Sequence, residues 1–145
     1  MNVPSMIDSE LQAARVAESM VLKMPQIACR TWHVLHGGIY SRTVVLEAGD
    51  TIVGAEILVP TTLFISGNLK IKTGGNVIDV YGTQVLAAGK GRKQVMHAVE
   101  RTTLTMSFVT SAKTIEEAED EFTNESEKLM SRLPESNNYI NITGE

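Results

Sequence analysis

The feature that most constrains this chain is the regular spacing of turn-forming residues through its middle. Between Ile27 and Thr110, short runs rich in β-branched and aromatic residues alternate with glycine, proline, asparagine or aspartate. The runs "LKIK" and "NVIDVYG", for example, flank the turn "KTGGN", whose glycines tolerate the positive φ of a hairpin. Turns at this spacing favour an antiparallel barrel or sandwich over alternating strands and helices.

A helix is expected on the N-terminal side of these strands. Residues 9–23 have helical spacing of apolar side chains, Asp8 or Ser9 can cap the first turn, and Pro25 ends the helix. The apolar stripe consists of Leu11, Val16, Met20 and Met24. Such a stripe needs a surface to cover it.

A second, acidic helix is expected after the strands, at residues 113–133. Thr114 and Glu117 have the spacing of a capping box, and Pro134 ends the helix. The last residues form a polar tail, which we expect to be mobile unless a partner orders it. The chain therefore divides into an N-terminal helix and arm (1–26), a strand-rich domain (27–112), an acidic helix (113–133) and a tail (134–145).

Composition excludes several classes of protein. With 13 basic and 17 acidic residues the net charge is −4, which argues against general nucleic-acid binding. The single cysteine, Cys29, allows no intrachain disulfide. We find neither an apolar run long enough for a membrane span nor a signal peptide, so a cytoplasmic location without membrane partners is expected.

The second half of the strand region resembles the cupin superfamily. The likeness is carried by "LFISGNLKIKTGGNVIDVYGTQVLAAGKGRKQVMHAVERTTL", with a strand ending in Ser-Gly, a glycine-rich hairpin, an Ala-Gly turn and a strand with a histidine. The resemblance implies a mainly β fold, a cupin-like antiparallel β-barrel (jelly roll) with flanking N- and C-terminal α-helices.

A narrower likeness is to small cupin-like proteins of tailed bacteriophages, whose pattern fits "HVLHGGIYSRTVVLEAGDTIVGAEI". The fitting residues are His33, Gly38, Tyr40, Arg42, Ala48, Gly49 and Gly54. It implies a phage-encoded protein that acts in the host cytoplasm.

The histidines do not complete the metal set of that family. Metal-dependent cupins supply a His-x-His pair and a carboxylate from the first half of the barrel and a last histidine from the second half. Aligned on Gly49, the pair falls on Ala55 and Ile57, and positions 60–62 hold no acid. Only His97 matches, so we expect neither a metal nor another cofactor.

Without a metal, the expected site is a ligand-binding cavity. Alternation places Lys93, Val95, His97 and Val99 on one face of a strand, which the cupin layout turns into the barrel. Arg42 and Tyr40 approach from the opposing sheet, and their groups suit a small anionic molecule. Further candidates are His33 at the rim and the basic loop of Lys90, Arg92 and Lys93.

Three functions remain open at this point. The first is a metal-free binding protein that holds or sequesters a host metabolite or a nucleotide defence signal. The second is a structural or assembly protein that works through its helices and tail. The third is a cupin-type enzyme, an isomerase or dioxygenase, which needs a metal or a base such as His97 paired with Tyr40. In each case a homodimer or higher oligomer is expected, because open sheet edges tend to pair.

Overall fold

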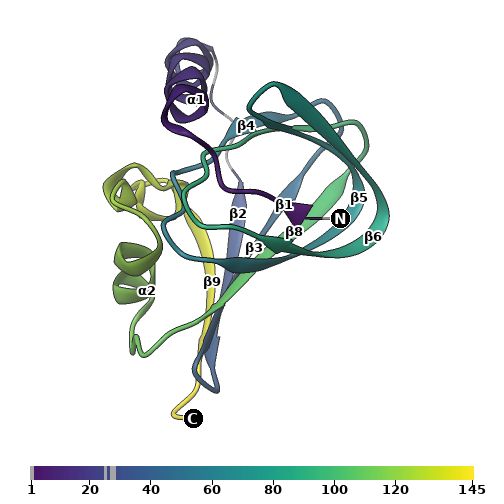
Figure 1. The fold of residues 1–145 in the computed structure, drawn as a ribbon. Helices are drawn as coiled ribbons and strands as arrows, with labels where there is room; N and C mark the ends of the chain where they lie inside the picture. Colours follow the sequence, from purple (N-terminus) through teal and green to yellow (C-terminus); the bar gives the residue numbers. More distant parts are fainter. Residues whose placement is uncertain (1, 25, 27–28) are drawn as a thin grey trace.

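The computed structural model describes residues 2–24, 26 and 29–145 (Figure 1). In chain order the elements are β1 (Asn2–Val3), α1 (Asp8–Val21), β2 (Arg30–His36), β3 (Ile39–Leu46), β4 (Thr51–Val53), β5 (Thr61–Thr73), β6 (Asn76–Ala88), β7 (Val95–Ala98), β8 (Thr102–Val109), α2 (Ile115–Phe122), the 3₁₀ turns η1 (Ser126–Lys128) and η2 (Met130–Arg132), and β9 (Asn137–Ile142). In this described part, no helix is both long enough and apolar enough to cross a membrane.

Two curved sheets share the long hairpin of β5 and β6. The first half of β5 pairs with β8, which continues through β3 and β2 to β9, and its second half pairs with β7, which pairs with β4. Most pairs are antiparallel, but β1 runs parallel to β6 and β9 runs parallel to β2. The predicted mainly β, jelly-roll fold, with one helix before the strands β2 to β8 and one after them in the chain, is therefore confirmed, and its sheet stays open among the described residues.

Glycine allows the long hairpin to pass from one sheet to the other. Gly67 of β5 has a φ of 146° and pairs with Gly82 of β6. A Cβ at Gly67 would lie 2.6 Å from the Arg101 carbonyl oxygen and 2.7 Å from the Cα of Thr102. The strand that enters the second sheet therefore needs glycine at this point, for its backbone conformation and for close packing.

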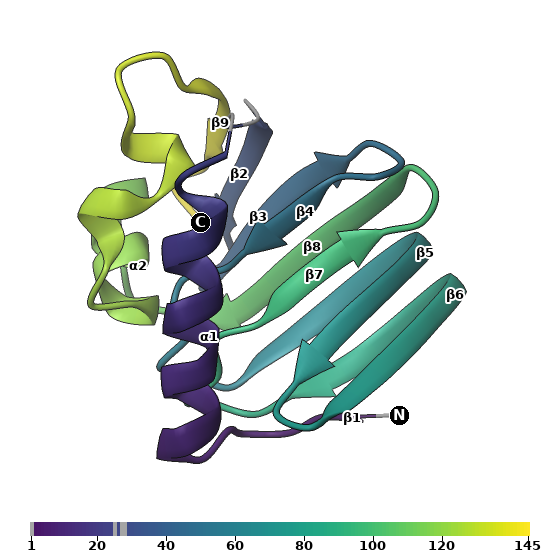
Figure 2. The same ribbon diagram turned by 90° about the horizontal axis from the view of Figure 1, so that it is seen from above.

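Apolar side chains fill the space between the sheets. Leu46, Ile65, Leu69, Ile71 and Val80 are fully buried there. The helix α2 covers one end of this core with Ile115, Ala118 and Phe122. Figure 2 shows α1 and α2 on the same side of the curved sheet. The core of the protein thus occupies the interior in which the sequence placed a cavity.

The C-terminal part departs from expectation. Thr114 accepts a hydrogen bond from Glu117 N at 3.1 Å, as the capping box predicts, but α2 ends at Phe122 instead of continuing to residue 133. Thr123 is extended (φ −151°, ψ 151°), and the two 3₁₀ turns follow. The tail predicted to be mobile forms β9, which pairs with β2 along its whole length.

The N-terminal helix is present, with two differences. Neither Asp8 nor Ser9 caps it; instead Glu10 Oε1 accepts a hydrogen bond from Ile7 N at 3.0 Å. Of the predicted stripe, Leu11 is buried, while Val16, Met20 and Met24 are 53%, 60% and 61% exposed. The predicted helix stop at Pro25 and the start of the strand region at Ile27 lie outside the described residues.

Candidate functional site

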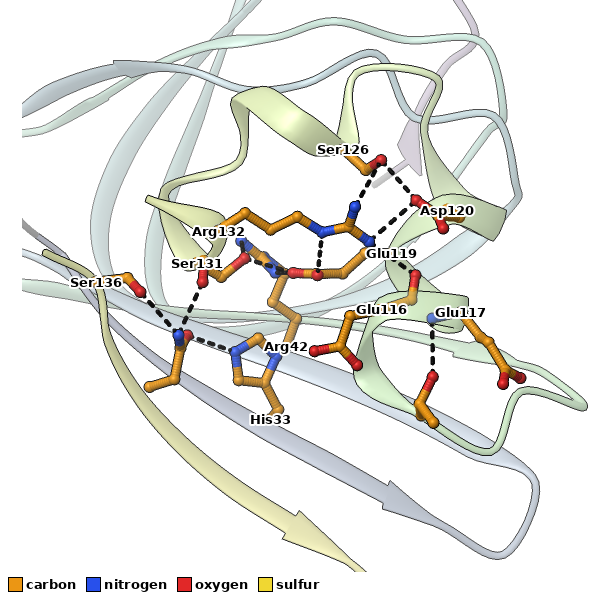
Figure 3. Close-up of polar contacts among 12 residues, drawn as sticks. His33, Arg42, Glu116, Glu117, Glu119, Asp120, Ser126, Ser131, Arg132 and Ser136 are labelled. Atoms are coloured by element: carbon orange, nitrogen blue, oxygen red, sulfur yellow. Dashed lines mark hydrogen bonds and ion pairs between the residues drawn. The ribbon is translucent and has the colours of Figure 1, made fainter. Parts of the chain in front are cut away.

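The strands β2 and β3 bring His33, Tyr40 and Arg42 together. His33 lies opposite Arg42 in the antiparallel register, and alternation turns the side chains of Tyr40 and Arg42 to the same, inner face. Tyr40 and Arg42 were expected to approach His97 across a cavity, but here Tyr40 contacts His33 instead. A C-terminal segment that the sequence did not place here lies beside His33 and Arg42 (Figure 3).

His33 is a buried, fully hydrogen-bonded imidazole. Asn138 donates through Nδ2 to Ser131 O, so its Oδ1 faces His33 and accepts from Nε2 at 2.8 Å. Nδ1 then accepts from the Tyr40 hydroxyl at 2.7 Å. Burial lowers the pKa of His33 and raises the pKa of Tyr40 to about 12. Both groups are therefore neutral near pH 7, and His33 links Tyr40 of β3 to Asn138 of β9.

Arg42 binds a carboxylate of the protein. Its Nη1 lies 2.8 Å from Glu119 Oε2, and its Nη2 donates to Ser131 Oγ at 3.0 Å. Arg132 Nε lies 2.9 Å from the other oxygen of Glu119, and Ser131 also donates to this carboxylate. Burial opposes ionisation of Glu119, but the hydrogen bonds from Ser131 and Arg132 and the charge of Arg42 outweigh it and lower the pKa. The guanidinium that was expected to hold an anionic ligand is thus neutralised by α2.

His97 lies elsewhere, and the expectation that it faces the interior is wrong. In β7 the inner positions are Met96 and Ala98, which are 8% and 0% exposed. His97 points outward, where its Nδ1 lies 2.7 Å from the Thr51 hydroxyl of β4. Side chains alternate between the two faces of a strand, so an alignment that is wrong by one residue exchanges the inward and the outward residues.

The basic loop does not form one anion site. Lys90 is exposed. Arg92 is buried and donates to Gly89 O at 2.6 Å and to Thr61 Oγ1 at 2.7 Å; burial lowers its pKa to about 10. Lys93 is buried between Glu18 and Glu125, at 2.8 Å and 2.9 Å from Nζ. Each side chain of the loop therefore has a different environment.

A pocket of about 330 Å³ lies beside the His33 network, between α2, η2 and β9. Its walls consist of His33, Ile115, Glu116, Glu119, Ser131, Arg132, Asn138 and Ile140. Figure 3 shows the Glu116 side chain extending from α2 toward the side of His33. Glu116 and His33 both line this pocket.

Several residues of this site were not identified from the sequence, namely Glu116, Glu119, Ser131, Arg132 and Asn138. One signal for Glu119 was present: it lies four residues after Ile115 and three before Phe122, on the apolar face of the helix. An acid within an apolar stripe indicates a buried ion pair. For Ser131 and Asn138 no such signal exists, because their place depends on how the chain folds back after α2.

Within the described ranges, no three His, Cys, Asp or Glu side chains are grouped so that they could hold a metal ion. Absence of a metal and of other cofactors stays a prediction from the sequence.

Comparisons with known proteins give matches in structure alone. No family model matches the chain, and no curated protein sequence does. The cupin domain of Cnp3 from Schizosaccharomyces pombe matches with a TM-score of 0.46 and 13% identity, over 57% of this chain and 60% of that one. Ectoine synthase from P. lautus gives a TM-score of 0.47 and 14% identity, over 59% and 67%.

A cupin-2 domain protein from Shewanella frigidimarina matches with a TM-score of 0.43 and 12% identity, over 68% of this chain and 98% of that one. At such low identities and TM-scores, these matches assign neither an activity nor a ligand to the chain. Origin in a bacteriophage, which rests on the pattern in β2 and β3, stays a prediction.

Proposed function

We propose that the protein binds a small polar molecule in the pocket between α2, η2 and β9. The observation that carries the proposal is the pocket itself, whose volume of about 330 Å³ falls in the range of small-molecule sites. The interior between the sheets, where the sequence placed the ligand, is filled by the core. Binding therefore uses a cavity outside the double sheet, next to His33.

The walls of the pocket favour a ligand with a cationic or hydrogen-bond-donating group on a small apolar body. Ile115 and Ile140 supply apolar surface. Arg42 and Arg132 both bind Glu119, and Arg132 also binds Asp120, so two carboxylates balance the two guanidinium charges. Glu116 adds a carboxylate that an ammonium group could approach. This ligand class replaces the anion that was inferred when Arg42 was expected to be free.

Titration followed by ¹H–¹⁵N NMR tests the proposal. The probes are choline, putrescine and L-arginine as cations, with citrate and ATP as anions. We expect saturable shifts of the Asn138 and Ser131 signals with at least one cation and none with either anion. The variant Ile140→Trp, which fills the pocket from an exposed position, should abolish these shifts, and Glu116→Gln should weaken them.

A matched control is Glu127→Gln, which removes an exposed carboxylate from η1, away from the pocket walls. It should bind as the wild type does. The proposal fails if no cationic probe shifts Asn138 at millimolar concentration, or if Ile140→Trp binds normally.

A further inference from the structure

The outer face of the larger sheet is nearly free of charge. Six strands, in the order β9, β2, β3, β8, β5 and β6, turn alternate side chains away from the core to form it. We call this surface the outer sheet face. Its central row, in direct register across all six strands, consists of Tyr139, Trp32, Thr43, Thr105, Phe64 and Val85.

Charged residues make up 21% of the chain, but the outer sheet face has very few. Along the outward positions of these six strands the side chains are serine, threonine, asparagine and apolar residues, with Arg30 and His36 at the two ends of β2. The outer side of the second sheet differs, because Lys70 and Asp79 form an ion pair there. Because the outward positions of these strands hold no acidic side chain, a basic partner would find no opposite charge there. A single arginine at the margin likewise gives an acidic partner little ionic attraction.

The hydroxyl groups in the middle of the face are paired with one another. Ser41 and Ser107 lie 2.8 Å apart, Thr43 and Thr105 2.7 Å, measured between hydroxyl oxygens. In each pair, one hydroxyl donates a hydrogen bond to the other. Removing these groups from water therefore costs less free energy than it would for hydroxyls without a partner. The face can thus be covered by a neutral surface.

Exposed apolar side chains lie at both ends of the central row and along one margin. Trp32 stacks on Tyr139 with ring centroids 5.4 Å apart, and at the other end Phe64 and Val85 are 38% and 67% exposed. Val109, at the margin, is 81% exposed. Large exposed apolar groups around paired hydroxyls are typical of an interface.

We propose that the outer sheet face binds the same face of a second copy of this chain. A two-fold interface requires a surface that complements itself, and a neutral face satisfies this without matching charges. The six strands span five inter-strand distances of about 4.8 Å, so the face is about 24 Å wide. Along each strand, three steps of two residues give a length of about 20 Å. Two copies then bury about 1,000 Å², which is below the size of standard stable interfaces and within the range of weak ones, so we expect a dimer that dissociates at micromolar concentration.

Sedimentation velocity over about 1 to 200 μM, combined with Trp32 fluorescence, tests this dimer. Trp32 is the single tryptophan of the chain and lies on the face, so its emission should move to longer wavelength as the dimer dissociates on dilution. Thr105→Lys at the centre and Val34→Lys nearer the margin should both give monomers at 200 μM. Melting temperatures of both variants identify any that fail to fold.

The control is Val77→Lys, which adds the same charge at a 56% exposed strand position on the outer side of the second sheet. It should remain dimeric. The proposal is overturned if the wild type is monomeric at 200 μM, if both folded face variants remain dimeric, or if Val77→Lys alone dissociates. The outcome of the pocket experiment does not depend on this dimer, because Asn138 lines the pocket on the inner side of the sheet, opposite the outer sheet face.

Discussion

Replacing Glu119 by glutamine should destabilise the protein by about 3 kcal/mol, the lower end of the range for breaking a buried ion pair. Glu119 is 2% exposed and binds Arg42, whose side chain is 12% exposed, at 2.8 Å. Glutamine keeps the size and one acceptor oxygen but leaves the charge of Arg42 unbalanced. Arg132 contributes less to the loss, because it is 25% exposed and retains Asp120 at 3.0 Å.

Urea unfolding followed by Trp32 fluorescence measures this loss. For a chain of this size it corresponds to a fall in Tm of about 6 to 12 °C. Hydrogen exchange should also quicken in β9, because Ser131 and Arg132, which precede it, are both held by Glu119. Glu127→Gln, an exposed acid of η1, should change the stability by less than about 0.5 kcal/mol.

A double-mutant cycle isolates the interaction itself. Arg42→Met combined with Glu119→Leu removes both charges, and its cost should be at least about 1 kcal/mol below the sum of the single costs. The reasoning is refuted if Glu119→Gln costs less than about 1 kcal/mol, or if the two single substitutions are additive.

Three further predictions concern buried groups outside that pair. Arg92 is buried, and its Nε has no hydrogen-bond partner among the described residues, so Arg92→Met should raise the urea midpoint, with an unchanged or lower midpoint contradicting the reasoning. The pKa values of His33, Glu119 and Glu125 are all lowered in the folded protein, so the unfolded chain binds more protons once the pH falls below the ordinary pKa of histidine and then of glutamate. Stability should begin to fall below about pH 6.5 and fall more steeply below about pH 5, as acid titration of the urea midpoint would show. Burial raises the pKa of the Cys29 thiol, so iodoacetamide at pH 8 should react with it at least tenfold more slowly in the native protein than in urea, as mass spectrometry can follow.

The double sheet could be predicted because its signals are local. Each turn is encoded by the residues that form it; the hairpin at Gly74 and Gly75, for example, joins Thr73 to Asn76 as the sequence indicates. The strand β9 could not be predicted in the same way. Its sequence "NNYINI" is short and polar, and its partner β2 lies about a hundred residues earlier, so no local pattern specifies the pairing.

The site was predicted in part for a related reason. Tyr40 and Arg42 do lie on one face of β3, two residues apart. What lies opposite Arg42 depends on where α2 packs and on how the chain returns through η2, which is tertiary information. For His97, the family resemblance suggested which residues of the strand point inward. The buried side chains of Met96 and Ala98 show that the inward residues are the neighbours of His97.

The buried cations link the helices to the strands, and this determines which surfaces remain for binding. Lys93 joins Glu18 of α1 to Glu125 behind α2, and Arg42 joins β3 to Glu119 of α2. Because removing either partner of such a pair is costly, the helices are fixed parts of the fold and the pocket has fixed walls. Among the described residues, no such ion pair fixes a helix over the outer sheet face. Neighbouring residues of β2 therefore serve opposite sides: His33 faces inward beside the pocket and Trp32 faces outward onto the neutral face. The proposed ligand binding and the proposed self-association should consequently be changed by separate substitutions in one folded chain.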